Sequence, residues 1–346
     1  MSSRRGPATA NAYRPPAWLP GRHAQTLYPF FLPRPDVAFQ RQRLETPDGD
    51  FWDVDWAGAR PDAQSTSPLL VVFHGLEGSS DSNYARHLMH EAQARGWRGA
   101  VPHFRGCSGE PNRLPRAYHS GDHAEVGVML TALRACVAPA TPMVAVGISL
   151  GGSALLNWLG RAGREASATI TAVATASVPL DLMAAGLAID RGFNRIYAWH
   201  FLHTLKPKAI ALAVRFPGRI DAGRVARATT MREFDDAVTA PLHGFADVDD
   251  YWTRGSSKPW LRGVAVPTLV LNARNDPFVP GISLPSDAEV SPSVHLEQPP
   301  AGGHAGFPDG RFPGSGAWLP RQLATFLATA LHDNHERLPT AALAPA

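Results

Sequence analysis

The stretch that decides the fold is Gly147-Ile148-Ser149-Leu150-Gly151. It follows an apolar, strand-like run at residues 142–146 and precedes a helix-like run at residues 153–159. A G-x-S-x-G sequence between a strand and a helix is typical of a nucleophile elbow, a turn so tight that the serine backbone is strained and its hydroxyl projects from the sheet. The flanking glycines fit this interpretation, because strand and helix backbones nearly touch at such a turn. The pattern predicts an α/β sheet in which Ser149 is the candidate nucleophile.

The chain around this turn alternates between strand-like and helix-like runs. An antiparallel hairpin is predicted where residues 39–45 and 51–56 flank the turn sequence Thr46-Pro47-Asp48-Gly49. Alternating strands and helices predict one doubly wound α/β domain with a mostly parallel sheet. Its other strands are expected at residues 68–73, 99–104, 169–176, 267–272 and 294–298, and its helices at residues 82–95, 122–136 and 317–331.

Two parts of the chain depart from this alternation. Residues 178–262 contain helix-like segments and no clear strand, which predicts a helical cap inserted into a core formed by residues 39–177 and 263–335. Residues 1–38 are rich in Pro and Arg. They are expected to lie over the core as an arm, because leaving their aromatic side chains in water would be costly. The tail, residues 339–346, is expected to be loose.

Composition excludes several classes of protein. The net charge is only +3 and no run of Lys or Arg occurs, so no nucleic-acid partner is expected. Two cysteines, Cys107 and Cys136, cannot form a disulfide framework. The longest mostly apolar stretch, residues 143–160, contains the elbow itself, and no apolar region follows Arg4-Arg5 as it would in a secretion signal. A cytoplasmic protein without a transmembrane segment is expected.

A serine nucleophile needs a base and an acid that orients the base. In sheets with this elbow, the chain order is serine, then acid, then histidine. Asp276 comes just after the strand predicted at residues 267–272, at the strand end where sites assemble in open α/β sheets. His304 follows the last predicted strand within a glycine-rich loop that could reach across the sheet to Ser149. These placements predict a triad of Ser149, His304 and Asp276.

An oxyanion hole requires two backbone N–H donors. One is expected from Leu150, directly after the nucleophile, and the other from the loop His74-Gly75-Leu76-Glu77-Gly78. Leu76 is the predicted second donor, because Gly75 allows the peptide to turn toward the site. His74 is expected to hold this loop through its imidazole rather than to take part in catalysis.

Other polar residues offer competing interpretations. His119 and His123 lie four residues apart beside Asp122, but no third metal ligand has a recognisable spacing, and Ser120-Gly121-Asp122 also fits a helix N-cap. Cys107 is expected to fill space in the core. Asp181 follows another predicted strand and competes with Asp276 for the role of the acid.

Aromatic residues of the insertion are candidates for substrate binding. Trp199 and Trp252, with Phe201 and Tyr251, could line an acyl pocket, or they could pack the insertion on itself. The sequence leaves both alternatives open.

Several motifs together resemble the YheT-type α/β-hydrolases. They are residues 73–80, 105–110, 118–121, 147–152, 275–278 and 303–307, joined by the arm segment 22–27. The similarity runs from about residue 18 to about residue 331. It implies a serine carboxylic-ester hydrolase with Ser149, Asp276 and His304 as its triad, acting on short- or medium-chain acyl esters. Some eukaryotic members of the family act on phospholipids.

Two further possibilities remain at this point. The chain could be a catalytically silent copy of the fold that serves as a binding module, since a fold does not determine a function. Alternatively, it could hydrolyse a thioester, an amide or a phospholipid ester. None of these mechanisms requires a cofactor or a metal, and the expected partner is a small or lipid-like acyl ester.

Overall fold

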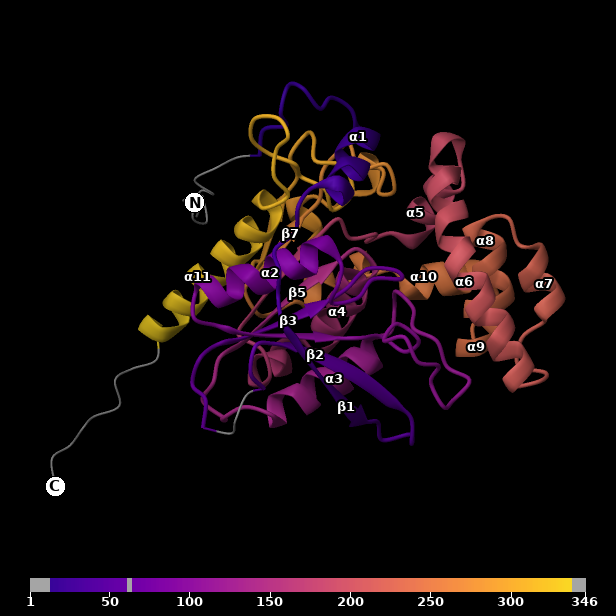
Figure 1. Ribbon diagram of the computed structural model, residues 1–346, viewed down its shortest axis with the longest axis horizontal. Helices are drawn as coiled ribbons and strands as arrows, with labels where there is room; N and C mark the ends of the chain where they lie inside the picture. Colours follow the sequence, from indigo (N-terminus) through magenta and orange to yellow (C-terminus); the bar gives the residue numbers. More distant parts are fainter. Residues whose placement is uncertain (1–12, 61–63, 338–346) are drawn as a thin grey trace, which may run out of the picture.

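The computed structural model describes residues 13–60 and 64–337. Its centre is an eight-stranded sheet in the order β1-β2-β4-β3-β5-β6-β7-β8 (Figure 1). The first twelve residues of the predicted arm and the tail at residues 339–346 lie outside the described residues. The strands are β1 (Phe39–Glu45), β2 (Phe51–Ala57), β3 (Leu69–Phe73), β4 (Arg98–Pro102), β5 (Met143–Ile148), β6 (Ala172–Ala176), β7 (Thr268–Leu271) and β8 (Val294–Glu297).

The sheet is antiparallel at one end and parallel in the rest. β1 and β2 form the predicted hairpin, β2 pairs antiparallel with β4, and all following neighbours are parallel. Strands β3, β5, β6 and β7 are buried along their whole length. Continuous apolar runs are what a parallel strand covered on both faces requires, so the sequence pattern located these strands within a few residues.

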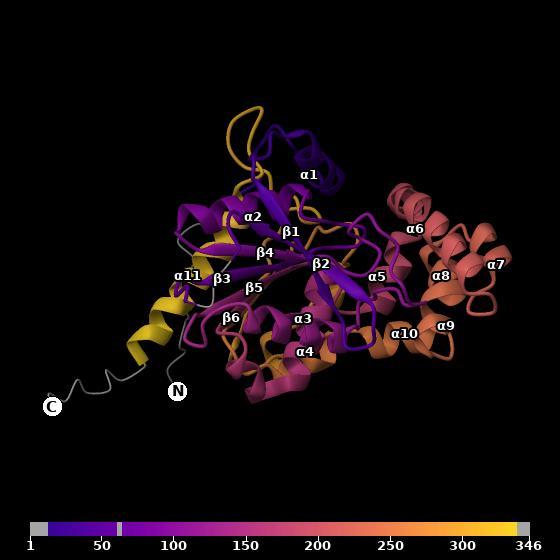
Figure 2. The same cartoon turned by 60° about the horizontal axis from the view of Figure 1, so that its bottom comes forward.

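Helices cover both faces of the sheet (Figure 2). Helices α2 (Asn83–Ala94) and α11 (Trp318–Arg337) pack together on one face, and α3 (His123–Ala135) and α4 (Leu150–Ala162) on the other. Each face has its own core of buried apolar side chains. The layers confirm the predicted α/β-hydrolase architecture, in which the elbow between β5 and α4 lies at the carboxyl ends of the parallel strands.

The ends of two helices differ in how they are capped. Gly96 has a φ of 70° directly after α2, the left-handed conformation that often ends a helix. Asp122 stands at the N-cap of α3, but its side chain makes no capping hydrogen bond. Its carboxylate instead accepts a hydrogen bond of 2.7 Å from Arg116. The nearby guanidinium offers a stronger, charge-assisted bond than a neutral backbone N–H.

Between β6 and β7 the chain forms a group of helices at one side of the sheet (Figure 1). Its α-helices are α5 (Leu182–Ile189), α6 (Arg195–Arg215), α7 (Ala222–Arg227), α8 (Met231–Phe234), α9 (Ala240–His243) and α10 (Val248–Gly255). Shorter helical turns are Gly192–Asn194, Asp235–Thr239 and Lys258–Gly263. These helices bury a small apolar core of their own, which includes Leu202, Val225 and Phe234.

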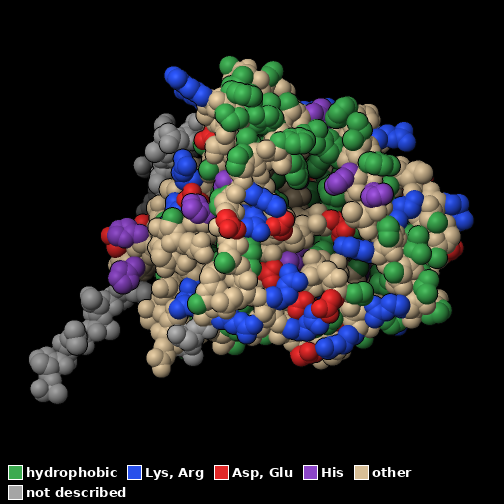
Figure 3. Space-filling model, viewed as in Figure 1, with side chains coloured by type: hydrophobic (Ala, Val, Ile, Leu, Met, Phe, Trp, Pro, Cys, Tyr) green, Lys and Arg blue, Asp and Glu red, His purple; other side chains and the backbone are tan. Residues whose placement is uncertain are grey.

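The described part of the arm lies across the carboxyl ends of the strands. It contains α1 (Arg22–Leu27) and a 3-10 turn, Tyr28–Phe31, beside the long loop that follows β8 (Figure 1). Tyr13 anchors the arm, because its hydroxyl donates a hydrogen bond of 2.8 Å to the Pro308 carbonyl and its ring packs on Phe307 and Trp318. Hydrophobic side chains gather on the surface over α1 and the adjoining loops (Figure 3).

The remaining short helices are 3-10 turns in loops, at Gly163–Ala168, Gly281–Ser283 and Asp287–Glu289. Within residues 13–60 and 64–337, no helix combines the length and hydropathy needed to cross a membrane.

Candidate active site

Ser149 occupies a strained turn that only glycine neighbours permit. Its φ of 51° and ψ of −121° lie outside the regions that ordinary residues favour. A Cβ atom added at Gly147 would lie 2.5 Å from the Gly152 Cα, and one added at Gly151 would lie 2.4 Å from the His74 carbonyl oxygen. Both distances are too short for any side chain. The G-x-S-x-G sequence therefore allows the close backbone contacts that hold Ser149 in this conformation.

Ser149, His304 and Asp276 form one continuous chain of hydrogen bonds. The His304 Nε2 atom lies 3.0 Å from Ser149 Oγ, and His304 Nδ1 lies 2.8 Å from Asp276 Oδ2. An ionised carboxylate only accepts hydrogen bonds, so Nδ1 carries the proton and Nε2 is left to accept from the serine hydroxyl. This arrangement can remove a proton from Ser149 during nucleophilic attack.

The carboxylate of Asp276 is held in place by its own loop. Its side chain is fully buried, and Oδ1 accepts hydrogen bonds from the backbone N–H groups of Phe278 (2.8 Å) and Val279 (3.2 Å). These bonds satisfy one oxygen and aim the other at His304. The buried carboxylate is thereby paired and hydrogen-bonded, as a charge in that position must be.

Backbone contacts fix the loop that carries His304. The His304 N–H donates to Thr26 Oγ1 at 3.0 Å, and the Ala305 N–H donates to Ser177 Oγ at 2.8 Å. The ring of Phe278 lies 4.3 Å from the imidazole, measured between centroids. The side chain of His304 is 12% exposed, so one edge of the ring is still open to the surface.

The loop after β3 contacts the nucleophile directly. A Cβ atom added at Gly75 would lie 3.3 Å from the Cβ of Ser149. The N–H of Gly75 donates to the hydroxyl of Tyr84 (2.9 Å), and the N–H of Glu77 donates to the hydroxyl of Tyr118 (2.8 Å).

The two tyrosines leave the N–H between them free. Neither Leu76 nor Leu150 has an acceptor for its backbone N–H anywhere in residues 13–60 and 64–337. These are the two donors that the sequence predicts for the oxyanion hole. The surrounding loop supports that prediction, because an oxyanion hole needs donors that are not already bonded.

His74 holds the loop, as predicted. It is completely buried, its Nδ1 lies 2.8 Å from the Gly75 carbonyl oxygen, and its Nε2 accepts from the Phe104 N–H at 3.2 Å. Burial, with a smaller contribution from His103, lowers the pKa of His74 to about 3. The imidazole is therefore neutral and serves as a fixed link between two loops.

Asp181, the competing candidate for the acid, and Cys107 both lie outside the triad. Asp181 is the N-cap of α5 and accepts a hydrogen bond of 3.0 Å from the Ala184 N–H, while Asp276 is bonded to His304. Cys107 packs against the core, and burial raises the pKa of its thiol to about 12. A thiol with that pKa is a poor nucleophile at neutral pH.

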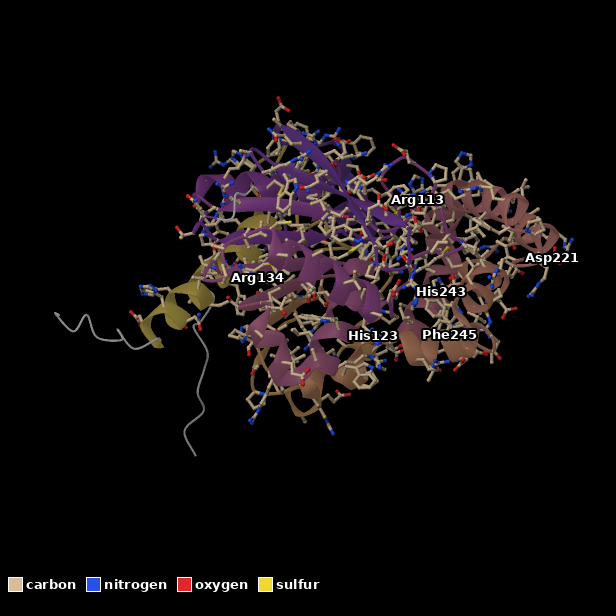
Figure 4. All side chains as sticks on the ribbon, turned by 90° about the horizontal axis from the view of Figure 1, so that it is seen from below. Arg113, His123, Arg134, Asp221, His243 and Phe245 are labelled. Carbon is tan, nitrogen blue, oxygen red and sulfur yellow. The ribbon has the colours of Figure 1, made fainter. Side chains whose placement is uncertain are left out.

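The histidines considered as metal ligands belong to a different contact. His119 precedes α3, and its ring lies 4.4 Å from that of His243, where the insertion meets the core. Figure 4 labels His243 on the insertion side of this boundary and His123 on the core side. Among the residues that the structure describes, no group of three or more potential metal ligands comes together.

Of the two alternatives for the tryptophans of the insertion, the contacts of Trp252 favour packing within the insertion, and Trp199 lies at the surface. Trp252 is 2% exposed, and its indole N–H donates a hydrogen bond of 2.9 Å to Asp235 inside the insertion. Trp199 is 66% exposed and stacks on His203. It is two positions from Tyr197 along α6, a rotation of about 200°, so it lies on the other side of the helix.

The aromatic residues that do approach the triad are Phe278 and, behind it, Tyr197 and Phe201. Tyr197 and Phe201 are spaced i, i+4 on α6 and therefore share a face. Phe201 is one of the residues predicted as a possible lining of an acyl pocket, whereas Tyr197 and Phe278 were not predicted, because the sequence does not show which side of the helix faces the core. Ser177 and Thr26, whose hydroxyls fix the His304 loop, were not predicted either.

Comparison with known proteins agrees with this fold. The family model described as the alpha/beta hydrolase fold matches residues 68–311, which is more than half of the chain. The chain therefore belongs to the α/β-hydrolase fold family.

Individual relatives narrow the placement within that family. YheT of Escherichia coli (strain K12) is 40% identical over 313 residues, covering 89% of this chain and 91% of YheT. The human protein named Phospholipase ABHD3 is 30% identical over 338 residues, covering 95% of this chain and 82% of its own length. The resemblance to YheT-type proteins inferred from the motifs is thus confirmed.

Among solved structures, the Pyrococcus furiosus esterase Pf2001 superposes with a TM-score of 0.53. The match covers 86% of this chain and 96% of that chain at 14% identity. A likeness at this level of identity shows the shared fold.

Proposed function

We propose that this protein is a serine ester hydrolase that uses Ser149, His304 and Asp276. The observation that carries the proposal is the unbroken chain of hydrogen bonds from Ser149 Oγ through both ring nitrogens of His304 to Asp276 Oδ2. A catalytically silent binding module would not require this arrangement, nor the strained backbone of Ser149. The names of its relatives, which include a phospholipase and a monoacylglycerol lipase, support the same reaction class.

The proposed reaction proceeds in two halves. Ser149 Oγ attacks the ester carbonyl carbon while His304 Nε2 takes its proton, and Asp276 stabilises the resulting imidazolium. The N–H groups of Leu76 and Leu150 bind the negative oxygen of the tetrahedral intermediate. His304 then donates the proton to the leaving alcohol. In the second half it activates a water molecule that releases the acid from the acyl-enzyme and returns the proton to Ser149.

The insertion is proposed to act as a cap, residues 178–262, that receives the acyl chain. Its helix α6 packs Tyr197 and Phe201 against Phe278, which itself contacts His304. Apolar side chains beside the base favour an aliphatic acyl group over a polar one. Short- or medium-chain carboxylic esters are therefore the proposed substrates, and the same surfaces would accept the acyl ester of a phospholipid.

The direct test is the Ser149→Ala variant assayed with a short-chain aryl ester. Loss of the nucleophile should lower kcat by several orders of magnitude while the fold stays intact, because the small residual rate comes from the oxyanion hole and binding alone. Ser167→Ala, an exposed serine in a 3-10 turn, is the matched control and should keep the full rate. A folded Ser149→Ala protein with more than about a tenth of the rate, a barrier change of only about 1.4 kcal/mol, would move the nucleophile elsewhere.

A further inference from the structure

The side chain of Gln25 in the arm joins the two loops that carry the acid and the base. Gln25 is 2% exposed. Its Oε1 accepts hydrogen bonds from Asn275 Nδ2 at 2.9 Å and from the Gly302 N–H at 3.1 Å. One amide oxygen therefore binds the residue immediately before Asp276 and a residue two positions before His304.

The bridge is closed by its other polar atoms. Gln25 Nε2 donates to the Leu19 carbonyl at 3.2 Å, which fixes the orientation of the amide. Asn275 Oδ1 accepts the Gly303 N–H at 3.1 Å, so the acid loop and the histidine loop are also bonded to each other. Because both polar atoms of each amide are hydrogen-bonded, neither loop can shift without breaking buried or half-buried hydrogen bonds.

The histidine loop is packed against the arm as closely as two backbones allow. A Cβ atom added at Gly306 would lie 1.9 Å from the Gln25 carbonyl oxygen, and one added at Gly303 would lie 2.8 Å from the Thr26 nitrogen. Thr26 Oγ1, on helix α1, also accepts a hydrogen bond from the His304 N–H. The glycines of this loop are thus required by contact with the arm as well as by any need to reach across the sheet.

Such a bridge matters because His304 must satisfy two distances at once. Its ring nitrogens lie 3.0 Å from Ser149 Oγ and 2.8 Å from Asp276 Oδ2, and these partners come from different strand ends. Catalytic groups need to be held within about 0.5 Å of their working geometry, and a displacement of about 1 Å can lower a rate about 100-fold. A buried amide bonded to both loops supplies this restraint.

We propose that Gln25 is a positioning residue for the triad, acting through Asn275 and the Gly302-Gly303 backbone to set the distance between His304 and Asp276. This inference rests on the proposed function. Gln25 does not touch the reacting atoms, so its loss should weaken the chemical step without weakening substrate binding. The arm is then a part of the active site, although it lies about 280 residues from His304 in the sequence.

The test compares Gln25→Met and Asn275→Ala in the full-length protein. Methionine has nearly the size of glutamine but forms neither bond. We expect kcat for a short-chain ester to fall about 10- to 100-fold with KM within about 2-fold of the original. The double variant should lose no more than the worse single variant, since both changes break one bridge.

The matched control is Asn83→Ala, which removes a hydrogen bond of 2.7 Å between Asn83 Nδ2 and the Pro29 carbonyl, in the turn of the arm that follows α1. It should lower the melting temperature without a comparable loss of kcat. The proposal is overturned if folded Gln25→Met keeps kcat within about 2-fold, if Asn83→Ala loses as much activity, or if the two losses multiply in the double variant. Retained activity in Ser149→Ala would instead contradict the proposed function, whatever the Gln25 variants do.

Discussion

At the scale of single residues, Asp276 and Asp181 follow neighbouring strands, and their hydrogen-bond partners distinguish the roles of the two carboxylates. One carboxylate oxygen of Asp276 accepts hydrogen bonds from two backbone N–H groups, and the other accepts from His304. A carboxylate oxygen of Asp181 accepts a hydrogen bond from a backbone N–H in the first turn of α5. The first arrangement orients an imidazole, whereas the second satisfies a helix end.

Replacing each carboxylate by its amide should therefore give opposite results. Asp276→Asn is expected to lower kcat about 10⁴-fold in a well-folded protein, because the amide would favour the wrong tautomer of His304. Asp181→Asn should change the rate little and cost at most about 1 kcal/mol of stability, because asparagine is also a good N-cap. Both are measured with one ester assay and thermal unfolding. A normal rate for Asp276→Asn beside a collapsed rate for Asp181→Asn would reverse the assignment.

The sequence was sufficient for some of these residues and insufficient for others. Ser149, Asp276 and His304 could be located because each belongs to a local pattern: a turn between strand and helix, or the end of an apolar strand. Within the described residues the N–H of Leu76 has no acceptor, while the N–H groups of Gly75 and Glu77 on either side of it are bonded to the hydroxyls of Tyr84 and Tyr118. No local pattern reports such contacts, so only the structure shows that the donor is available.

At the scale of elements, α6 connects the insertion to both halves of the site. Phe201 approaches Phe278 with ring centroids 6.5 Å apart, and Phe278 contacts His304. Farther along the helix, Lys208 forms an ion pair of 2.8 Å with Glu77, the residue after Leu76 in the loop that follows β3. On the proposed function, a change in α6 can therefore affect acyl binding and the proposed oxyanion hole separately.

Phe201→Ala should shift the preference among acyl chain lengths. Removing a half-buried ring behind Phe278 creates space on the proposed acyl path, and one or two methylenes in such a pocket are worth about 1–3 kcal/mol. The ratio of kcat/KM for an octanoyl ester to that for an acetyl ester is expected to rise about 10-fold or more. The matched control is Trp199→Ala, which lies on the other side of α6 and should leave the ratio unchanged.

Two results would contradict this role of α6. One is an equal loss at every chain length in Phe201→Ala, which would indicate packing alone. The other is a shifted ratio in Trp199→Ala, which would restore the tryptophan that the structure places at the surface.

Predictability also differed among elements. The buried strands could be predicted because each is an apolar run bounded by turn residues. The insertion could be identified as helical, but its short helices and the face that each buries depend on contacts between them. The arm was expected to cover the core, yet its place at the triad rests on Gln25 and Thr26 meeting residues about 280 positions away.

At the scale of the whole molecule, buried neutral histidines should make stability depend on pH. Burial lowers the pKa values of His74, His119 and His243 from 6.5 to about 3. Between these values the unfolded chain binds more protons than the folded one, so the free energy of unfolding falls as the pH falls below about 6.5. Above that pH the effect vanishes. Half-buried Asp235, whose pKa is raised to about 6 by loss of solvation, opposes this effect below pH 6.

The contact between His119 and His243 offers a test. We expect the melting temperature to decrease when the pH is lowered from 7.5 to 5, and to decrease less in His243→Gln. The reason is that each such histidine changes the free energy of unfolding by up to about 1.4 kcal/mol per pH unit. Exposed His203→Gln is the control and should follow the original protein. An unchanged slope in His243→Gln would contradict the prediction. The charged and titratable groups around the pair are Arg105, Arg116, Asp122 and His123.

The central claim is that Ser149 is a nucleophile activated by His304. It is tested most directly by reacting the purified full-length protein with a fluorophosphonate probe and locating the adduct by peptide mass spectrometry. The account predicts one adduct, on the peptide that contains Ser149. The adduct should be absent in folded Ser149→Ala and strongly slowed in His304→Ala, because the serine then lacks its base. A folded protein that stays unlabelled, or that is labelled equally well in Ser149→Ala, would contradict it.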